Sequence, residues 1–155
     1  MEFKLNAQQE RFRSELCAYL NKNLTPELKQ ANADAGDMSG YNWDFVVEFR
    51  KRLSKDGYLA VGWPADYGGG GKDLIHQTLL FEECDYHGVP GLNPTYAYMA
   101  QAIIMLGSEE QRKLLLPRIA SGELDIVVGY SEPEAGSDLA NIQTTAVRQG
   151  DDFIV

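Results

Sequence analysis

The pattern of hydrophobic and polar residues predicts helices along most of the first 122 residues. Asn6 can cap a helix over residues 7–22, in which apolar side chains recur every three or four positions. Pro26 suits the first position of a short second helix. Over residues 43–55, one apolar face is combined with acidic residues early and basic residues late, which suits the helix dipole, and Gly57 is a natural stop. The chain is therefore expected to open with three helices.

A loop then interrupts the helical pattern. Residues 62–71 contain a proline and the run Gly68 to Gly71, a composition that excludes long regular structure. Asp73 can cap a fourth helix that reaches His87. Another helix is expected from Asn93-Pro94 to Gly107, with Ala97, Ala100, Ile103 and Ile104 on its buried side.

One more helix is predicted by a capping box. Ser108 and Gln111 have the spacing at which each side chain can bond the other residue's backbone N–H. Pro117 is expected to end or kink this helix, because proline lacks the N–H that the helix interior needs. Gly122 is expected to close the helical part of the chain.

The pattern after Gly122 changes to that of β-strands. Residues 126–130 and 144–149 are rich in β-branched and aromatic residues, and Gly150 begins a turn before a last strand over 153–155. A hairpin arm of three residues leaves an apolar edge that folded proteins normally protect. We therefore expect a mainly α chain that is the front part of a longer protein, with a helical domain over 1–123 and the beginning of a β-domain over 124–155.

Composition narrows the functional classes. The chain has 155 residues, with 14 basic and 23 acidic side chains and a net charge of −9, which argues against a nucleic-acid partner. The N-terminus lacks the features of a secretory signal, and the most apolar segment, 96–106, is shorter than the ~20 residues that cross a bilayer. We expect a cytoplasmic protein without membrane insertion. Cys17 and Cys84 stand apart from other metal-ligand residues, so neither a disulfide framework nor a zinc site is expected.

Two sequence motifs fail as enzyme sites. A phosphate-binding loop that ends at Lys72 would need glycine in place of Asp66 and serine or threonine in place of Asp73. The run from Gly129 to Pro133 resembles the nucleophile elbow of hydrolases, but Pro133 replaces the last glycine. The glycine run is therefore expected to be structural, and hydrolase chemistry is disfavoured.

The histidines and paired acids also have ordinary structural explanations. His76 and His87 are eleven residues apart, do not share a helical face, and are expected to face solvent or lie at helix ends. The adjacent acids Glu82-Glu83 and Glu109-Glu110 diverge around a helix. We expect them to be solvated or to serve as cap partners.

The segment 128–138, Val-Gly-Tyr-Ser-Glu-Pro-Glu-Ala-Gly-Ser-Asp, is the strongest candidate for chemistry. It leads from a predicted strand into a loop of small, hydroxyl and acidic side chains. Such a loop can aim backbone N–H groups and the hydroxyls of Ser131 and Ser137 at one electron-rich ligand. An ordinary turn capped by serine and aspartate is an equally good explanation from the residues alone.

The same segment strongly resembles the acyl-CoA dehydrogenase signature, in which a strand leads into [S/T]-E-P-x-x-G-S-D. Ser131 stands where many members have threonine, and Glu134 where glycine is frequent. Other parts of the chain resemble that family in order and spacing: Trp63-Pro64, Tyr67-Gly68-Gly69, the Glu82-Glu83 helix, 106–111, Leu116-Pro117 and Ala120-Ser121-Gly122. The resemblance covers nearly the whole chain.

The resemblance implies a fold and a reaction. Members of the family have an N-terminal helical bundle, a middle β-barrel domain and a C-terminal four-helix bundle, bind FAD, and are often homotetramers. This chain would hold the first domain and the first strands of a truncated second one. The complete enzyme would convert an acyl-CoA to a trans-2-enoyl-CoA in fatty acid metabolism and pass electrons to an electron-transfer flavoprotein. The glutamate base of the family is absent here, so no residue is assigned as catalytic.

Positions that match the family's motifs are expected to form the binding site. Val128, Tyr130, Ser131, Gly136 and Ser137 are expected to bind FAD, with Ser131 near the flavin N1 and O2 and Ser137 close to the pyrophosphate and to the CoA moiety of the substrate. Thr95, Tyr98 and Met99 are expected to line the acyl tunnel, although core packing is as good an explanation for each. No metal ligand is expected.

Three alternatives remain open from the sequence. The complete enzyme could pass its electrons to oxygen, as an acyl-CoA oxidase does. The chain by itself could be a helical folding and interaction module, because most of the flavin site lies in the absent domains. The missing half could also come from a partner polypeptide in a heteromeric assembly.

Overall fold

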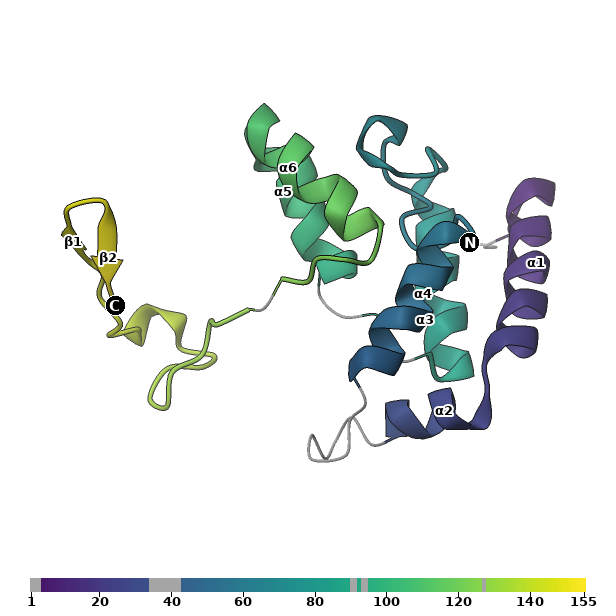
Figure 1. Ribbon diagram of the computed structural model, residues 1–155, viewed down its shortest axis with the longest axis horizontal. Coiled ribbons are helices and arrows are strands. Elements are labelled where there is room, and N and C mark those ends of the chain that lie inside the picture. The colour runs from purple at the N-terminus through teal and green to yellow at the C-terminus, as the bar shows by residue number, and fades with distance from the viewer. Residues whose placement is uncertain (1–3, 34–42, 90–91, 93–94, 127) are drawn as a thin grey trace.

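The computed structural model describes residues 4–33, 43–89, 92, 95–126 and 128–155. A helical body is followed by an exposed C-terminal segment that ends in a β-hairpin (Figure 1). The helices are α1 (Ala7–Asn23), α2 (Pro26–Ala33), α3 (Trp43–Lys55), α4 (Leu74–His87), α5 (Ala100–Leu106) and α6 (Glu109–Ala120). The short turns are the 3₁₀ turns η3 (Ala65–Tyr67) and η5 (Leu139–Asn141) and the π-helical turn η4 (Thr95–Met99).

The hairpin consists of β1 (Val147–Gln149) and β2 (Asp152–Ile154), which pair antiparallel with Val147 opposite Ile154. In the described residues it is the whole sheet, and all of its residues are exposed. The prediction of a mainly α chain with a terminal hairpin is confirmed. Across the described ranges, no helix is both long and apolar enough to cross a membrane.

The helix starts predicted at Asn6, Asp73 and Ser108 are confirmed, and each depends on neighbouring residues. The Asn6 side chain accepts the N–H of Gln9 at 3.0 Å, and the Gln9 side chain accepts the N–H of Asn6 at 3.0 Å. Ser108 and Gln111 form the same reciprocal box at the start of α6. The third helix occupies the predicted residues 43–55. These capping contacts join residues only three positions apart, so the sequence alone can predict them.

The hydrophobic core joins all of the helices described in the body. Its largest fully buried side chains are Trp63, Tyr96, Phe49, Leu16, Leu20, Leu53, Leu59, Leu80, Leu116, Ile119, Val46 and Val61. Trp63, from the glycine-rich loop, stacks on Tyr96 with ring centroids 6.5 Å apart. Ala100 is buried as expected, whereas Ile103 and Ile104 are half-buried, and Asn93 and Pro94 lie outside the described residues.

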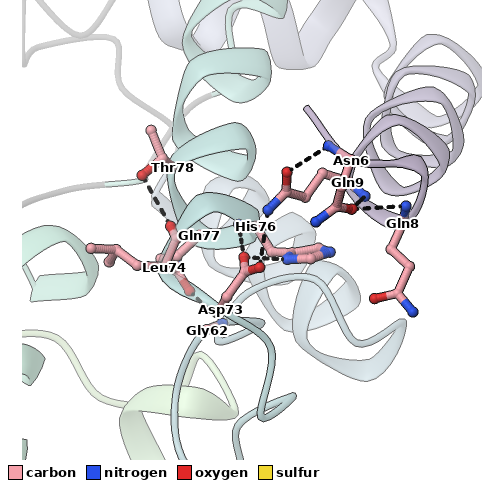
Figure 2. A network of polar contacts seen from close by, with 9 residues as sticks. All are labelled: Asn6, Gln8, Gln9, Gly62, Asp73, Leu74, His76, Gln77 and Thr78. Carbon is pink, nitrogen blue, oxygen red and sulfur yellow. Dashed lines mark hydrogen bonds and ion pairs between the residues drawn. The ribbon is translucent and has the colours of Figure 1, made fainter. Parts of the chain in front are cut away.

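A network of polar side chains ties the beginnings of α1 and α4 together (Figure 2). Asp73 caps α4 by accepting the N–H of His76 at 3.1 Å, and it accepts the side-chain N–H of Gln9 from α1 at 3.0 Å. The His76 ring nitrogen Nδ1 lies 2.6 Å from Asp73 Oδ1, an arrangement that lowers the pKa of the Asp73 carboxyl. His76 lies at a helix end, which is one of its two expected placements, but its ring does not face solvent: it is buried against Phe12, with ring centroids 5.1 Å apart.

A second polar cluster joins α1 and α4 farther along. Arg13 Nε donates to Glu83 Oε1 at 2.5 Å, and the Cys17 thiol donates to Glu83 Oε2 at 3.1 Å. His87 Nδ1 bonds the Glu83 carbonyl oxygen at 2.8 Å. The expectation that Glu83 is solvated is therefore wrong: it is 4% exposed. Donor atoms of Cys17, Glu83 and His87 lie within 4.8 Å of one another, but each has a hydrogen-bond partner, which favours a helix-joining cluster over a metal centre.

Pro117 does not end its helix. α6 continues to Ala120, and Gly122, with φ of 78°, follows as predicted. The helix persists because Leu116 and Ile119 are fully buried on either side of the proline. Packing of an apolar face contributes more to helix stability in proteins than local propensity does.

Ile126 and residues 128–130 do not form the predicted strand. The structure assigns no strand to Ile126 or to 128–130, and Val127 lies outside the described residues. The reason is the lack of a neighbouring strand in the described chain. A β-branched segment becomes a strand only when another strand accepts its ladder hydrogen bonds, and Ile126 bonds to a side chain instead.

Candidate functional site

The candidate loop is attached to the helical body through residues 122–126. Gly122 lies so close to α3 that a Cβ built on it would be 3.2 Å from the Lys51 backbone nitrogen. Arg50 of α3 donates to the Gly122 carbonyl at 3.3 Å, and its Nη1 lies 2.7 Å from Asp125 Oδ2. The guanidinium also lies 5.5 Å from the centre of the Tyr96 ring. A buried cation thus anchors the start of this connection.

Thr95 anchors the end of the same connection. Its hydroxyl donates to the Ile126 carbonyl at 3.1 Å and accepts the Ile126 N–H at 2.9 Å. Thr95 is fully buried and lies at the first position of η4. Both backbone groups of Ile126 are therefore satisfied by one side chain. The sequence analysis missed Arg50 and Asp125, which are 75 positions apart and share no local pattern.

The residues expected to bind FAD lie together in the exposed loop beyond this connection. Val128 is half-buried, Tyr130 is 57% exposed, and Ser131, Gly136 and Ser137 are exposed. Within the loop, Glu132 and Ala135 exchange backbone hydrogen bonds at 2.9 and 3.2 Å. The loop is thus a folded turn in which Ala135 is buried while Ser131, Gly136 and Ser137 are presented to solvent.

Glu132, the acid of the signature, holds the two sides of this loop together. Its carboxylate accepts the backbone N–H of Gln143 at 2.9 Å and that of Thr144 at 2.8 Å. The hydrogen bond to the Thr144 side chain is the main reason that the pKa of the Glu132 carboxyl is lowered, and these N–H groups add to it. The sequence analysis gave Glu132 no role. The sequence signal for this role was an acid beside a proline in a predicted turn. A carboxylate in such a turn can accept two backbone N–H groups from the segment that follows the turn.

The donor chemistry of the loop fits an electron-rich group such as a flavin. Ser131 and Ser137 provide hydroxyl donors on one exposed turn. A Cβ built at Gly129 or Gly136 would meet no heavy atom within 4 Å, so the backbone is open to close approach. Among the described residues, however, the helical body does not cover this turn, and the loop provides only one side of a pocket.

The residues expected along the acyl tunnel are divided between the core and the surface. Thr95 is buried and its hydroxyl is occupied by Ile126, whereas Tyr98 is 47% exposed and Met99 is half-buried. All three belong to η4. π-helical turns occur frequently at functional sites. Tyr98 and Met99 are therefore the members of this group that remain accessible to a ligand.

Comparison with known proteins identifies the family. The family model for the acyl-CoA dehydrogenase N-terminal domain matches residues 6–123. The acyl-CoA dehydrogenase FadE26 of Mycobacterium tuberculosis is 40% identical over the whole chain, and FadE29 of the same organism is 36% identical. The chain spans 38% and 39% of these two relatives.

Solved structures agree with this result. A chain of the ChsE4–ChsE5 complex of M. tuberculosis aligns with a TM-score of 0.82 at 39% identity. The alignment covers 99% of this chain and 38% of the matching chain. The Tcur3481–Tcur3483 steroid ACAD aligns with a TM-score of 0.85 at 36% identity, and the alignment covers 99% of this chain and 39% of the matching chain. The helical body and the first hairpin match this fold along essentially their whole length, and the chain belongs to the acyl-CoA dehydrogenase family.

Proposed function

We propose that this chain is the N-terminal part of an FAD-dependent acyl-CoA dehydrogenase that converts an acyl-CoA to its trans-2-enoyl-CoA. The observation that carries the proposal is the match of residues 6–123 to the family's N-terminal domain, followed directly by the open Ser131–Ser137 turn. The proposed boundary between the helical domain and the start of the β-domain lies between residues 123 and 124. It is supported by the end of the family match and by the change from helices to strands.

In this proposal, Val128, Tyr130, Ser131, Gly136 and Ser137 bind FAD. The cofactor would accept the hydride from the substrate's β-carbon, and a base of the complete protein outside this chain would take the α-proton. The Ser131 hydroxyl would donate a hydrogen bond to the flavin ring, where fixed donors stabilise developing negative charge. Ser137 would donate to the pyrophosphate or to the CoA ester. Tyr98 and Met99 would contact the acyl group, while Thr95 would act through the backbone that it holds.

The proposed assembly is heteromeric, and the proposed acyl group is bulky. Two of the matching structures contain two different chains each, and one of them is a steroid ACAD. A further match comes from work on an electron transferring flavoprotein of Acidaminococcus fermentans, at 29% identity, which supports a flavoprotein as electron acceptor. A homo-oligomer is the alternative assembly.

The reaction is tested with the complete protein, purified with any partner chain that co-purifies. It should be yellow, and its flavin absorbance should bleach anaerobically when a steroid side-chain acyl-CoA or a straight-chain acyl-CoA is added. Bleaching by the steroid thioester alone would support the bulky substrate. Flavin absorbance that persists with every thioester would overturn the dehydrogenase proposal, and rapid reoxidation in air without an acceptor would favour an oxidase.

A second candidate, a helical folding and interaction module, concerns the 155-residue chain alone. It is favoured by the exposure of Tyr130 and the open surroundings of Gly136, which leave the turn uncovered on one side. Every ~1.4 kcal/mol of lost contact weakens cofactor binding tenfold. We therefore expect the isolated chain to be purified without flavin. Stoichiometric FAD on this chain would contradict this candidate.

The two serines should have separable roles in the complete protein. Ser131→Ala should lower the reduction potential of the flavin, because it removes a charge-assisted hydrogen bond of roughly 1.5–3 kcal/mol that favours the reduced, more negative ring. Ser137→Ala should instead weaken FAD or CoA-ester binding and leave the potential nearly unchanged. Redox titration and calorimetry check the pair. If neither variant alters potential or affinity, the turn is structural and the residue assignments are wrong.

A further inference from the structure

Arg50 is a buried cation of α3 whose polar contacts reach Gly122 and Asp125. It is 2% exposed, whereas the other basic residues of α3, Lys51, Arg52 and Lys55, are exposed. Burial of a charge is costly unless the charge is paired and hydrogen-bonded. The guanidinium forms an ion pair with the Asp125 carboxylate at 2.7 Å and donates to the Gly122 carbonyl at 3.3 Å, while its Nε has no hydrogen-bond partner among the described residues. The cation therefore binds the connection that leaves the bundle.

Thr95 binds the same connection by a different means. Its hydroxyl donates to one backbone group of Ile126 and accepts from the other, at 3.1 and 2.9 Å. These two hydrogen bonds replace those that a neighbouring β-strand would make to the Ile126 backbone. An unsatisfied buried backbone group is expensive, so the hydroxyl strongly restricts where Ile126 can lie.

Arg50 and Thr95 are the last buried side chains seen to hold the backbone before Ser131. Beyond Ile126, Val128 is half-buried, and Gly129 to Ser131 are exposed. Ser131 is five residues past Ile126, so the position of Ile126 limits where Ser131 can lie. Misplacement of a functional group by about 1 Å can cost ~100-fold in rate.

We infer that Arg50 and Thr95 are positioning residues: together they form a polar clamp on residues 122–126 that sets the placement of Ser131 toward the cofactor. The inference rests on the proposed function for its link to flavin. The clamp itself is a property of this chain, and it can be measured without any cofactor.

The first experiment measures the clamp in the 155-residue chain by amide hydrogen exchange and NMR. Thr95→Val keeps the shape but removes both hydrogen bonds, and should speed exchange of the Ile126 amide about tenfold or more. It should also shift the amide signals of 128–131. Thr95→Ser should restore both readouts, and Arg50→Lys, which cannot hold Gly122 and Asp125 together, should give an intermediate loss.

The matched control is Gln77→Met. Gln77 is 3% exposed, and its side chain accepts the Gly62 N–H at 2.9 Å, so its bond holds the loop 62–71 and not residues 122–126. This variant loses a comparable buried hydrogen bond and should leave Ile126 and 128–131 unchanged. An Ile126 amide that exchanges at the same rate in the native chain and in Thr95→Val would overturn the clamp.

The second experiment tests positioning in the flavin-loaded complete protein by a double-mutant cycle. Thr95→Val should lower the flavin potential when Ser131 is present, and should have no further effect in the Ser131→Ala background. Equal shifts in both backgrounds, or no shift, would overturn the positioning role. Failure of the complete protein to bind flavin would overturn the proposed function, and the exchange and NMR data would still decide whether the clamp places 128–131.

Discussion

Gly69→Ala should destabilise the chain by about 3 kcal/mol or more, measured as the free energy of unfolding in urea. A Cβ at Gly69 would lie 2.2 Å from the Trp63 carbonyl oxygen and 2.4 Å from its carbonyl carbon. Because these are backbone atoms of a fully buried residue, no side-chain movement can relieve the overlap. Trp63 would have to leave its place in the core.

Gly129→Ala is the control for this prediction. A Cβ at Gly129 meets nothing within 4 Å, so the same substitution should change stability by no more than about 0.5 kcal/mol. Equal stability of the Gly69 and Gly129 variants would contradict the close packing of the loop on Trp63.

The same loop geometry argues against a phosphate site. The N–H groups of Gly69, Gly70 and Gly71 donate to the carbonyls of Pro64, Ala60 and Trp63 at 3.1, 2.9 and 2.8 Å. N–H groups bonded within the loop cannot surround phosphate oxygens. The glycine run is structural, as expected.

Glu83→Gln should cost about 2 kcal/mol of folding stability at neutral pH, because it removes the charge that Arg13 pairs with and an acceptor for the Cys17 thiol. This loss of stability is smaller than that expected for a fully buried ion pair, because the Arg13 side chain is 45% exposed and can be hydrated. Thermal or urea unfolding measures it. Glu82→Gln, one position earlier on the exposed face, is the matched control and should change stability by less than about 0.5 kcal/mol.

The effect of Glu83 should depend on pH. Burial by itself raises the pKa of the Glu83 carboxyl, but the hydrogen bonds from Cys17 and Arg13 outweigh it and hold the pKa below its usual 4.5. A carboxyl with a lowered pKa in the folded state stabilises the protein fully above that usual value, and the stabilisation is lost as the pH falls through the folded pKa. The native chain and Glu83→Gln should therefore converge in stability in acid. A difference that stays constant from pH 7 to pH 3 would contradict this role.

Interactions between neighbouring residues made much of the fold predictable from the sequence. The boxes at Asn6 and Ser108, and the positive φ of Gly57 and Gly122, depend only on residues a few positions away. The signature around Ser131 identified the family for a similar reason, because its residue types and spacing lie within one loop. These features are local, and a linear sequence displays them directly.

The tertiary structure decided the features whose partners are distant in sequence. Arg50 meets Asp125 and Thr95 meets Ile126, so a segment expected to be a strand is held as an extended connection. Glu83 reaches back to Arg13, so an acid expected in solvent is a buried carboxylate paired with a partly exposed arginine. The physical reason is common to these cases: a buried polar group is stable only with a partner, and the choice of partner depends on which elements pack together.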